Sequence, residues 1–383
     1  MTRIRRRKLL AGAAIAPLIA LLAACGGSDA AGGGGSAGPA KADDLAGVDA
    51  AGKAELDRLY KAAKSSGKTT VHLYSPYAPS DPNEALGKVF ATFAATYPGI
   101  KVDAQLLSGA QLFAKVDGEF ASGKRTADAV LSGPSDVGYF LGQKRLAAYD
   151  PPTAAKLAAD FKEPDHRYNV PFQSLFGLVY NTRLVRKGEA PTTLAGVLDP
   201  KWKGRLTFGQ PNGVSPTDFS LATLKTNGLL NEDQLKQLNT LVPVENRYKS
   251  VVDAVQAVAQ GRYGLTIWGP SQIAANAKER GAPIAVGSLT DAWVLNGPGY
   301  GVLEGAPNAD AAKLLETWLF TPTAQKQIAE YSYNYGTIPG SSAPPGFPDL
   351  SGYKLKSIPA KDFSGLLKQN QPRWTAIFGG PKA

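Results

Sequence analysis

Serine, asparagine and aromatic residues recur in short loops along this chain, and such side chains suit binding better than covalent chemistry. Hydroxyl groups and the free N–H groups at a helix start donate hydrogen bonds to anions, and an aromatic ring offers an apolar face. A serine or asparagine beside a helix start is also the usual N-cap, so each position has a structural explanation as well. Five loops have this composition: Ser75-Pro76-Tyr77, Ser108-Gly109-Ala110-Gln111, Ser132-Gly133-Pro134-Ser135, Asn212-Gly213-Val214-Ser215 and Trp268-Gly269-Pro270.

The chain carries no complete catalytic motif. Ser65-Ser66-Gly67-Lys68 has the Ser-x-x-Lys spacing of penicillin-binding enzymes, but no Ser-Asp-Asn or Lys-Thr-Gly partner accompanies it. Gly34-Gly35-Ser36-Ala37-Gly38 has the Gly-x-Ser-x-Gly spacing, but it lies in a Gly/Ser/Ala-rich stretch and not at the strand-to-helix turn of a nucleophile elbow. No P-loop or His-Glu-x-x-His sequence occurs. A single cysteine excludes an intramolecular disulfide, and with only two histidines a Cys/His zinc site cannot be assembled. These observations predict a binding protein without a cofactor, with an extracellular enzyme as the alternative.

The first 25 residues have the order of a secretory signal. Residues 3–8 are basic, residues 11–24 are apolar, and Leu22-Ala23-Ala24 leads into Cys25, the only cysteine. The apolar run is shorter than the roughly 20 residues that span a bilayer. The ending resembles the bacterial lipobox, and Arg6-Arg7 fits a twin-arginine signal or a general one. We expect residues 1–24 to be removed, Cys25 to be lipidated, and residues 25–47 to tether the protein to the outer face of the cell membrane.

The formal net charge of +10 is concentrated in this leader. After Ala24 the chain carries 37 basic and 32 acidic side chains, a mild excess that does not indicate a nucleic-acid partner. Its 383 residues are enough for two or three domains with sizeable cores.

Apolar residues in the body alternate between strand and helix spacing. Strands are predicted at residues 69–74, 100–107, 127–131, 204–208 and 263–268. Helices are predicted at residues 86–97, 111–121, 231–241, 250–260 and 311–318, with a short one near 361–368. This alternation predicts an α/β fold with parallel strands. Tyr331, Tyr333 and Tyr335 alternate as in a strand with all three rings on one face, either at the surface or lining a cleft.

Several short motifs carry a family resemblance through the order in which they occur. They are Leu73-Tyr74-Ser75, Thr96 to Val102, Ala127 to Ser132, Val179 to Thr182, Leu198-Asp199-Pro200-Lys201-Trp202-Lys203-Gly204-Arg205, Gly299 to Val302 and Gly305 to Asn308. On these motifs the chain resembles the solute-binding lipoproteins of bacterial ABC importers, with the type 2 periplasmic-binding fold, in the branch that includes ferric-iron-binding proteins. The resemblance implies two α/β lobes around a ligand cleft, residues 48–178 plus 301–340 and residues 179–300 plus 341–383. The lobes would be joined by strands that cross near Val179–Asn181 and Leu295–Gly301.

The resemblance also implies where the ligand lies, because open α/β sheets bind ligands beyond the carboxyl ends of their strands. The five polar loops fall at such ends. The expected ligand residues are Ser75, Tyr77, Ser108, Gly109, Ser132, Ser135, Asn212, Gly213, Ser215, Trp268, Tyr300 and Tyr333. The implied partners are the ligand and the importer's membrane permease and ATPase, and we expect the protein to be a monomer. The sequence fits a role in sensing as well as one in transport, because both would use the same closure of the lobes.

The identity of the ligand is less constrained than its position. Ferric members of the branch hold iron with tyrosinate oxygens, often as a Tyr-Tyr pair in the second lobe. Here the matching segment, Gly264 to Pro270, contains no tyrosine, and Ala78 stands where a histidine is expected. Helix starts rich in donors favour a small organic anion, such as a carboxylate or a phosphate or phosphonate ester. We rank a neutral carbohydrate-like or aromatic ligand second, and keep ferric iron as the third alternative.

Overall fold

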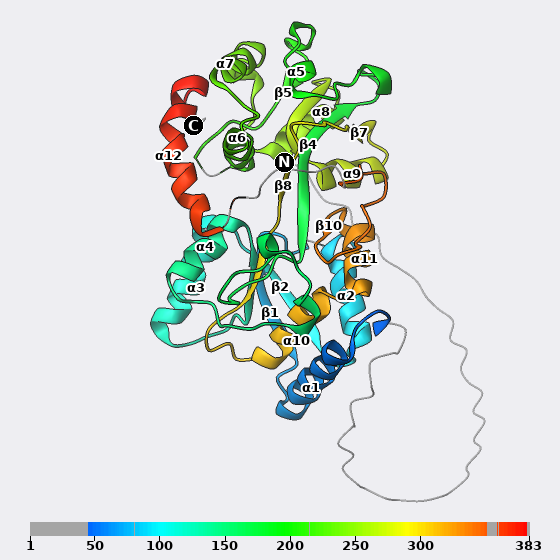
Figure 1. Cartoon of the computed structure of the whole chain (residues 1–383), viewed down its shortest axis with the longest axis vertical. Coiled ribbons are helices and arrows are strands. Elements are labelled where there is room, and N and C mark those ends of the chain that lie inside the picture. The colour runs from blue at the N-terminus through cyan, green and yellow to red at the C-terminus, as the bar shows by residue number, and fades with distance from the viewer. Residues whose placement is uncertain (1–44, 80, 214, 351–357, 359, 381–383) are drawn as a thin grey trace, which may run out of the picture. The chain divides into compact units, whose positions relative to one another are not determined.

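The computed structural model describes residues 45–79, 81–213, 215–350, 358 and 360–380. The predicted signal peptide, Cys25 and most of the predicted tether lie outside the described residues. The described residues belong to one compact unit, residues 37–383, which contains two β-sheets flanked by helices (Figure 1). No helix in this part of the chain is both long enough and apolar enough to cross a membrane.

The described residues contain twelve α-helices and ten β-strands. The helices are α1 (Ala50–Ser66), α2 (Leu86–Thr96), α3 (Gly109–Ser122), α4 (Pro134–Gly142), α5 (Leu194–Val197), α6 (Pro216–Thr226), α7 (Glu232–Leu241), α8 (Val251–Ala259), α9 (Ser271–Glu279), α10 (Ala309–Leu319), α11 (Pro322–Ser332) and α12 (Ala360–Phe378). The strands are β1 (Thr70–Ser75), β2 (Lys101–Leu106), β3 (Ala129–Ser132), β4 (Phe172–Asn181), β5 (Leu206–Thr207), β6 (Leu265–Pro270), β7 (Ile284–Val286), β8 (Val294–Asn296), β9 (Gly299–Val302) and β10 (Tyr335–Gly336). The predicted α/β class is confirmed.

The first lobe is built on the sheet with strand order β2-β1-β3-β9. Strands β1, β2 and β3 are parallel, and β9 runs antiparallel to β3. Helices α1, α2, α10 and α11 bury their apolar faces against this sheet; the ring of Phe93 lies 5.4 Å from that of Trp318. Because the three parallel strands end at one edge, the loops after Ser75, Leu106 and Ser132 lie together there.

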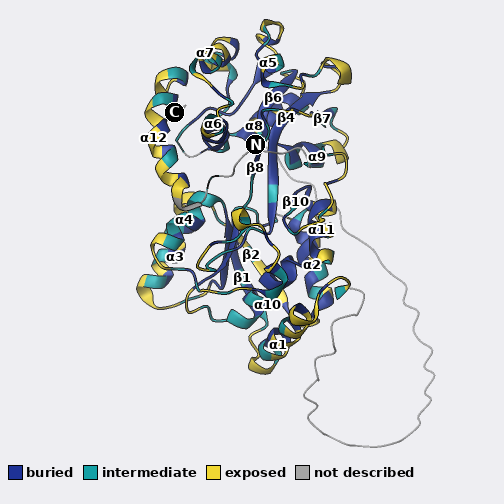
Figure 2. Ribbon diagram, in the orientation of Figure 1, coloured by how far each residue is buried: buried dark blue, intermediate teal, exposed yellow. Residues whose placement is uncertain are grey.

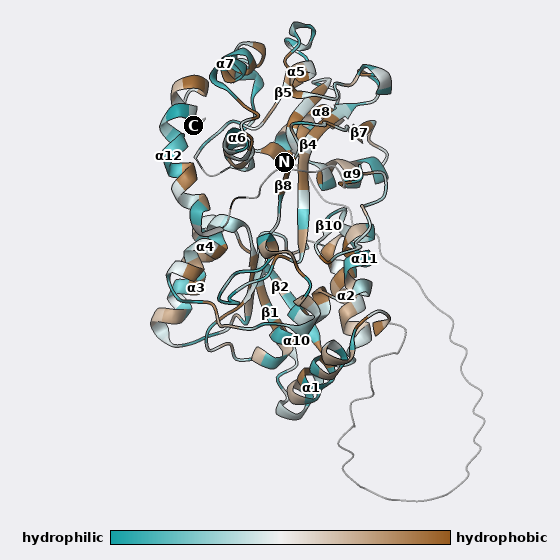
Figure 3. Cartoon of the chain, in the orientation of Figure 1, coloured by the Kyte–Doolittle hydropathy of each residue, from teal (hydrophilic) through white to brown (hydrophobic). Residues whose placement is uncertain are grey.

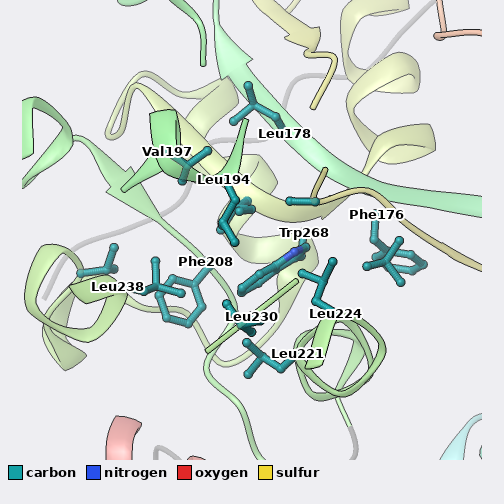
Figure 4. Packing of buried hydrophobic residues seen from close by; sticks show 14 of the residues in the cluster. Phe176, Leu178, Leu194, Val197, Phe208, Leu221, Leu224, Leu230, Leu238 and Trp268 are labelled. Atoms are coloured by element: carbon teal, nitrogen blue, oxygen red, sulfur yellow. The ribbon is translucent and has the colours of Figure 1, made fainter. Parts of the chain in front are cut away.

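The second lobe is built on the sheet with strand order β10-β4-β6-β5, and β7 and β8 also pair with β4. Its strands are almost wholly buried, while α7 and α12 expose their outer faces (Figure 2). The hydropathy colouring agrees, with apolar strands and polar outer helix faces (Figure 3). Trp268 lies at the centre of this lobe's core, surrounded by leucines and by Phe208 (Figure 4).

The chain crosses between the two sheets along β4 and again between β8 and β9. Phe172, at the start of β4, belongs to the core of the first lobe, whereas Val179 pairs with β6 and β7 in the second sheet. The second crossing follows Asn296, because β8 pairs with β4 and β9 pairs with β3. The predicted division between the lobes stays a prediction, but these pairings place the first crossing nearer Phe172 than Val179.

One prediction about local structure was wrong, and another gave only part of a helix. Tyr331 lies in α11, Tyr333 ends that helix with φ 53°, and Tyr335 lies in β10, so the three rings do not share one strand. The helix predicted near residues 361–368 extends to Phe378 and contains Pro372. Proline is costly inside a helix, so α12 depends on tertiary contacts: its Phe363, Leu367, Trp374 and Phe378 lie in the core of the second lobe.

Glu316 on α10 predicts a pH dependence of stability. Burial raises the pKa of this carboxyl to about 8, partly offset by a hydrogen bond that the amide of Asn169 donates. The folded protein therefore holds a proton that the unfolded chain releases near pH 4.5, and stability falls as pH rises from about 5 to 8. We expect the unfolding free energy of the wild-type protein to fall by on the order of 3–5 kcal/mol over this range, and that of the Glu316→Gln variant not to show this fall. Urea unfolding of both proteins at pH 5 and pH 8.5 measures this difference. An equal change of the unfolding free energy with pH in the wild-type and Glu316→Gln proteins would contradict the assignment to Glu316.

Candidate functional site

A cavity of about 970 Å³ lies between the two lobes. The first lobe contributes the loops after β1, β2 and β3, and the second contributes the loop after β5 and the starts of α6 and α8. Helix α12 forms a third wall. Seven of the predicted ligand residues line the cavity: Tyr77, Ser108, Gly109, Ser135, Asn212, Gly213 and Ser215. Strand-end loops from both sheets therefore meet in one place, which we call the cleft.

Four helices of nine or more residues start at the cleft: α3, α4, α6 and α8. In α3 and α4 no side chain caps the first turn, because the hydroxyl of Ser108 makes no cap bond and the N-cap of α4 is Gly133. In α4, Pro134 has no N–H and the N–H of Asp136 donates to the Gly133 carbonyl. The donors without a capping side chain are therefore the N–H groups of Gly109 and Ala110 in α3 and of Ser135 in α4. Such groups, with the positive end of the helix dipole, favour a bound anion.

The second-lobe helices are capped by their own side chains. The hydroxyl of Ser215 accepts from the N–H of Asp218, whose carboxylate accepts from the N–H groups of Asn212 and Ser215. The hydroxyl of Ser250 accepts from the N–H of Asp253 at 3.1 Å. The N-cap explanation therefore describes these two serines, and in Ser215 both the hydroxyl and the backbone N–H are bonded to Asp218.

Two exposed lysines line the cleft, Lys249 just before α8 and Lys368 on α12. Asp136 is the one acidic residue among the lining residues, and its carboxylate accepts a hydrogen bond from Ser132. Burial raises the pKa of Asp136, while the bond from Ser132 lowers it. The balance of charge on the wall is therefore positive, which again favours an anion.

Helix α12 contributes cleft residues that the sequence reasoning missed. Phe363, Leu367 and Gln371 follow one another at four-residue spacing on the cleft side, beside Ser364 and Lys368. Opposite them, Gly213 has φ 93°, and a Cβ atom there would lie 2.7 Å from the Gln371 amide nitrogen. Glycine is therefore required at this position. The apolar residues 363, 367, 374 and 378 repeat at helical spacing and could have indicated this helix, but Pro372 interrupts the pattern.

Aromatic rings give the cleft an apolar surface beside its polar groups. Tyr77, Phe113, Tyr139, Phe219 and Phe363 all line it. Phe219 and Phe363, from α6 and α12, have ring centroids 4.9 Å apart, whereas Phe113 and Tyr139, from α3 and α4, are 4.5 Å apart. Each lobe therefore presents an aromatic pair, which suits a ligand with an organic body.

Five predicted ligand residues do not line the cleft. The hydroxyl of Ser75 donates to the Leu131 carbonyl at 2.6 Å, and that of Ser132 is bonded to Asp136. Tyr300 is buried and donates to the Ala312 carbonyl. These three groups are occupied by partners within the first lobe.

Trp268 and Tyr333 are displaced from the cleft for other reasons. Trp268 has no exposed surface, because a φ of 55° turns its ring into the core of the second lobe. Tyr333 lines a separate cavity of about 290 Å³, where it is hydrogen-bonded to Glu279 and stacked with Phe347. We correct the predicted contact set by leaving out these two residues together with Ser75, Ser132 and Tyr300.

No group of three or more His, Cys, Asp or Glu side chains that could hold a metal ion occurs among residues 45–380 as far as they are described. Tyrosines are present in the cleft, but burial raises the pKa of Tyr77 to about 12, mainly by desolvation and further by the charge of Asp136. Its phenol is therefore protonated at neutral pH and suited to packing or to hydrogen bonding.

Comparison with known proteins gives a family match and a set of similar folds. The sequence model of the family described as "Bacterial extracellular solute-binding protein" matches residues 88–352. No curated protein sequence matches the chain. Iron-bound HitA from Pseudomonas aeruginosa is similar in structure, with 18% identity, a TM-score of 0.65, and coverage of 81% of this chain and 99% of that one.

Two other similar structures show the range of this fold. One is AfuA from Actinobacillus pleuropneumoniae with fructose-6-phosphate bound, with 20% identity, a TM-score of 0.64, and coverage of 81% of this chain and 98% of that one. The other is the apo ferric ion-binding protein A of Pasteurella haemolytica, with 18% identity, a TM-score of 0.62, and coverage of 82% and 99%. At these identities the likeness concerns the fold.

Proposed function

Since the chain belongs to the family of bacterial extracellular solute-binding proteins, we propose that its cleft captures a small organic anion for an ABC importer. The observation that carries the proposal is the convergence of the uncapped starts of α3 and α4 with Lys249 and Lys368 on one cavity. One solved structure with this fold holds fructose-6-phosphate, a sugar that carries an anionic group. A charged head and an organic body together match a cleft lined by donors and by rings.

The proposed mechanism is closure of the two lobes on the ligand. The acidic group of the ligand accepts hydrogen bonds from the backbone N–H groups of Gly109, Ala110 and Ser135, and from the two lysines. The aromatic pairs, Phe113 with Tyr139 and Phe219 with Phe363, pack on its organic body. Closure excludes water and strengthens these charge-assisted bonds, because the local dielectric constant falls. The importer's permease then accepts the solute from the closed protein, and its ATPase is the further expected partner.

The proposed contact set follows from the cleft. It contains the predicted residues Tyr77, Ser108, Gly109, Ser135, Asn212, Gly213 and Ser215, to which we add Lys249, Phe363, Lys368 and Gln371. Ser215 lines the cleft as the N-cap of α6, with its hydroxyl and its N–H both bonded to Asp218.

A thermal-shift screen with citrate, phenyl phosphate, glucose 6-phosphate, glucose and Fe(III) tests the ligand class, with product analysis of every hit. Stabilisation by organic anions without turnover is expected. Stabilisation by Fe(III) alone, with a coloured tyrosinate complex, would overturn the anion assignment in favour of iron. Turnover of a hit would instead show an enzyme.

We further propose that the protein is secreted as a monomer and held at the membrane by lipid on Cys25. The support is the basic, apolar and small-residue order that ends at the only cysteine. Mass spectrometry of the membrane-extracted protein should show an N-terminus at Cys25 with a diacylglyceryl mass increment. Retention of Met1, or an unmodified Cys25 thiol, would contradict the tether.

A further inference from the structure

One end of the second lobe carries most of the unpaired positive charge of that lobe. Three segments meet there: residues 182–187, residues 199–205 and residues 261–262. The guanidinium of Arg205 donates to the Leu184 carbonyl at 2.8 Å. A Cβ atom on Gly261 would lie 4.0 Å from the Leu184 side chain, and Gly264 donates its N–H to the Arg205 carbonyl. The three segments therefore form one continuous surface, which we call the basic end.

The basic end has seven exposed basic side chains: Arg183, Arg186, Lys187, Lys201, Lys203, Arg205 and Arg262. Three carboxylates lie on or beside the same segments, those of Glu189 and Glu245, which are exposed, and that of Asp199, which is partly buried. In the part of the chain that the structure describes, only Lys201 among the seven has a carboxylate within 4 Å, that of Asp199 at 3.7 Å. Six cations are therefore held close together without a carboxylate partner, although like charges repel.

Exposed aliphatic side chains accompany these cations. Leu184, between Arg183 and Arg186, is 44% exposed, and Val244 is 47% exposed. Val244 lies in the turn whose Asn246 accepts a hydrogen bond from Tyr263, the neighbour of Arg262. Of the four large hydrophobic side chains that are exposed in the described residues, Leu184 thus lies at the basic end and Val244 beside it.

This end faces away from the cleft. Helix α8 begins at the cleft with Val251 and ends at Ala259, two residues before the basic end. Nine helical residues separate the two by about 13 Å along the helix axis. A partner bound at the basic end would therefore leave the cleft open to solvent.

We propose that the basic end docks on an anionic lipid surface. Clustered lysine and arginine side chains are attracted to anionic headgroups, and single exposed aliphatic groups insert at the boundary with the acyl chains. A protein partner fits less well, because the centres of protein interfaces are depleted in charged residues and enriched in aromatic ones, whereas this end exposes seven cations and its Trp202 is buried. The permease that receives the solute lies in the membrane, so docking on the lipid surface keeps the protein near the permease.

Vesicle sedimentation tests this with residues 37–383, the compact unit that contains both cores. We expect binding to vesicles of 70% phosphatidylcholine and 30% phosphatidylglycerol at 50 mM NaCl, at least tenfold weaker binding at 300 mM NaCl, and none to pure phosphatidylcholine. The triple change Arg183→Gln, Arg186→Gln and Lys187→Gln should weaken vesicle binding at least tenfold without changing the melting temperature.

The control triple Lys68→Gln, Lys101→Gln and Lys124→Gln removes the same charge from exposed positions on the first lobe. It should weaken vesicle binding less than twofold. Equal losses in both triples would overturn the proposal by showing a response to net charge alone. Absence of vesicle binding together with slower solute uptake by cells carrying the first triple would also overturn it, in favour of a protein partner.

Discussion

Changing Lys249 and Lys368 together to glutamine should weaken anion binding about 100-fold while leaving the melting temperature of the empty protein unchanged. Both side chains are exposed on the wall of the cleft, and neither forms an ion pair among the described residues, so their removal costs the empty fold little. Hydrogen bonds to charged groups contribute about 1.5–3 kcal/mol each, and the lower end of that range corresponds to roughly tenfold per lysine. Isothermal titration with the best anion from the thermal-shift screen measures the change.

Two comparisons make this result specific. The pair Lys68→Gln and Lys124→Gln lowers the net charge equally on the far side of the first lobe and should change affinity less than twofold. A neutral ligand, if one binds, should be held equally well by the wild-type protein and the cleft variant. An unchanged Kd for the anion in the cleft variant would show that the charged head lies elsewhere.

Arg247→Ala should lower the free energy of unfolding by about 3 kcal/mol or more and also weaken ligand binding. The guanidinium is buried between the rings of Phe208 and Phe378, and it donates to the Phe378 carbonyl at 2.7 Å and to the Gln210 amide oxygen. It thereby satisfies a carbonyl at the C-terminal end of α12, where a positive charge is favourable. Without it, α12 loses its anchor on the second lobe, and Lys368 and Gln371 lose their positions in the cleft.

Arg247→Lys separates charge from geometry in this prediction. Burial lowers the pKa of the Arg247 guanidinium to about 10, so the residue stays charged at neutral pH. The same lowering from the ordinary lysine pKa of about 10.4 would leave a lysine mostly charged as well, but a lysine cannot reach the Phe378 carbonyl and Gln210 together with a planar fork. Both variants should therefore speed amide exchange in α12. Equal exchange rates in α12 for the wild-type and alanine proteins would contradict the anchoring role.

The local elements and the place of the cleft followed from short stretches of sequence. Leu86, Val89, Phe90 and Phe93 repeat at helical spacing and form α2, and the apolar run at Ala129–Ser132 forms a buried strand. Parallel strands end at one edge of a sheet, so the sequence predicts that loops such as Ser108–Gly109 and Ser135 lie at the cleft, as they do. These features depend on residues close together in the chain.

Tertiary structure alone decided which polar and aromatic groups are free to meet a ligand. The hydroxyl of Ser75 is bonded to a carbonyl 56 residues away, and a positive φ turns Trp268 into a core assembled from distant helices. Helix α12 continues through Pro372 because Trp374 and Phe378 pack on the second lobe and Arg247 donates a hydrogen bond to the Phe378 carbonyl. No sequence pattern within β1, β6 or α12 indicates these partners, since the free energy that selects them comes from contacts between residues far apart in the chain.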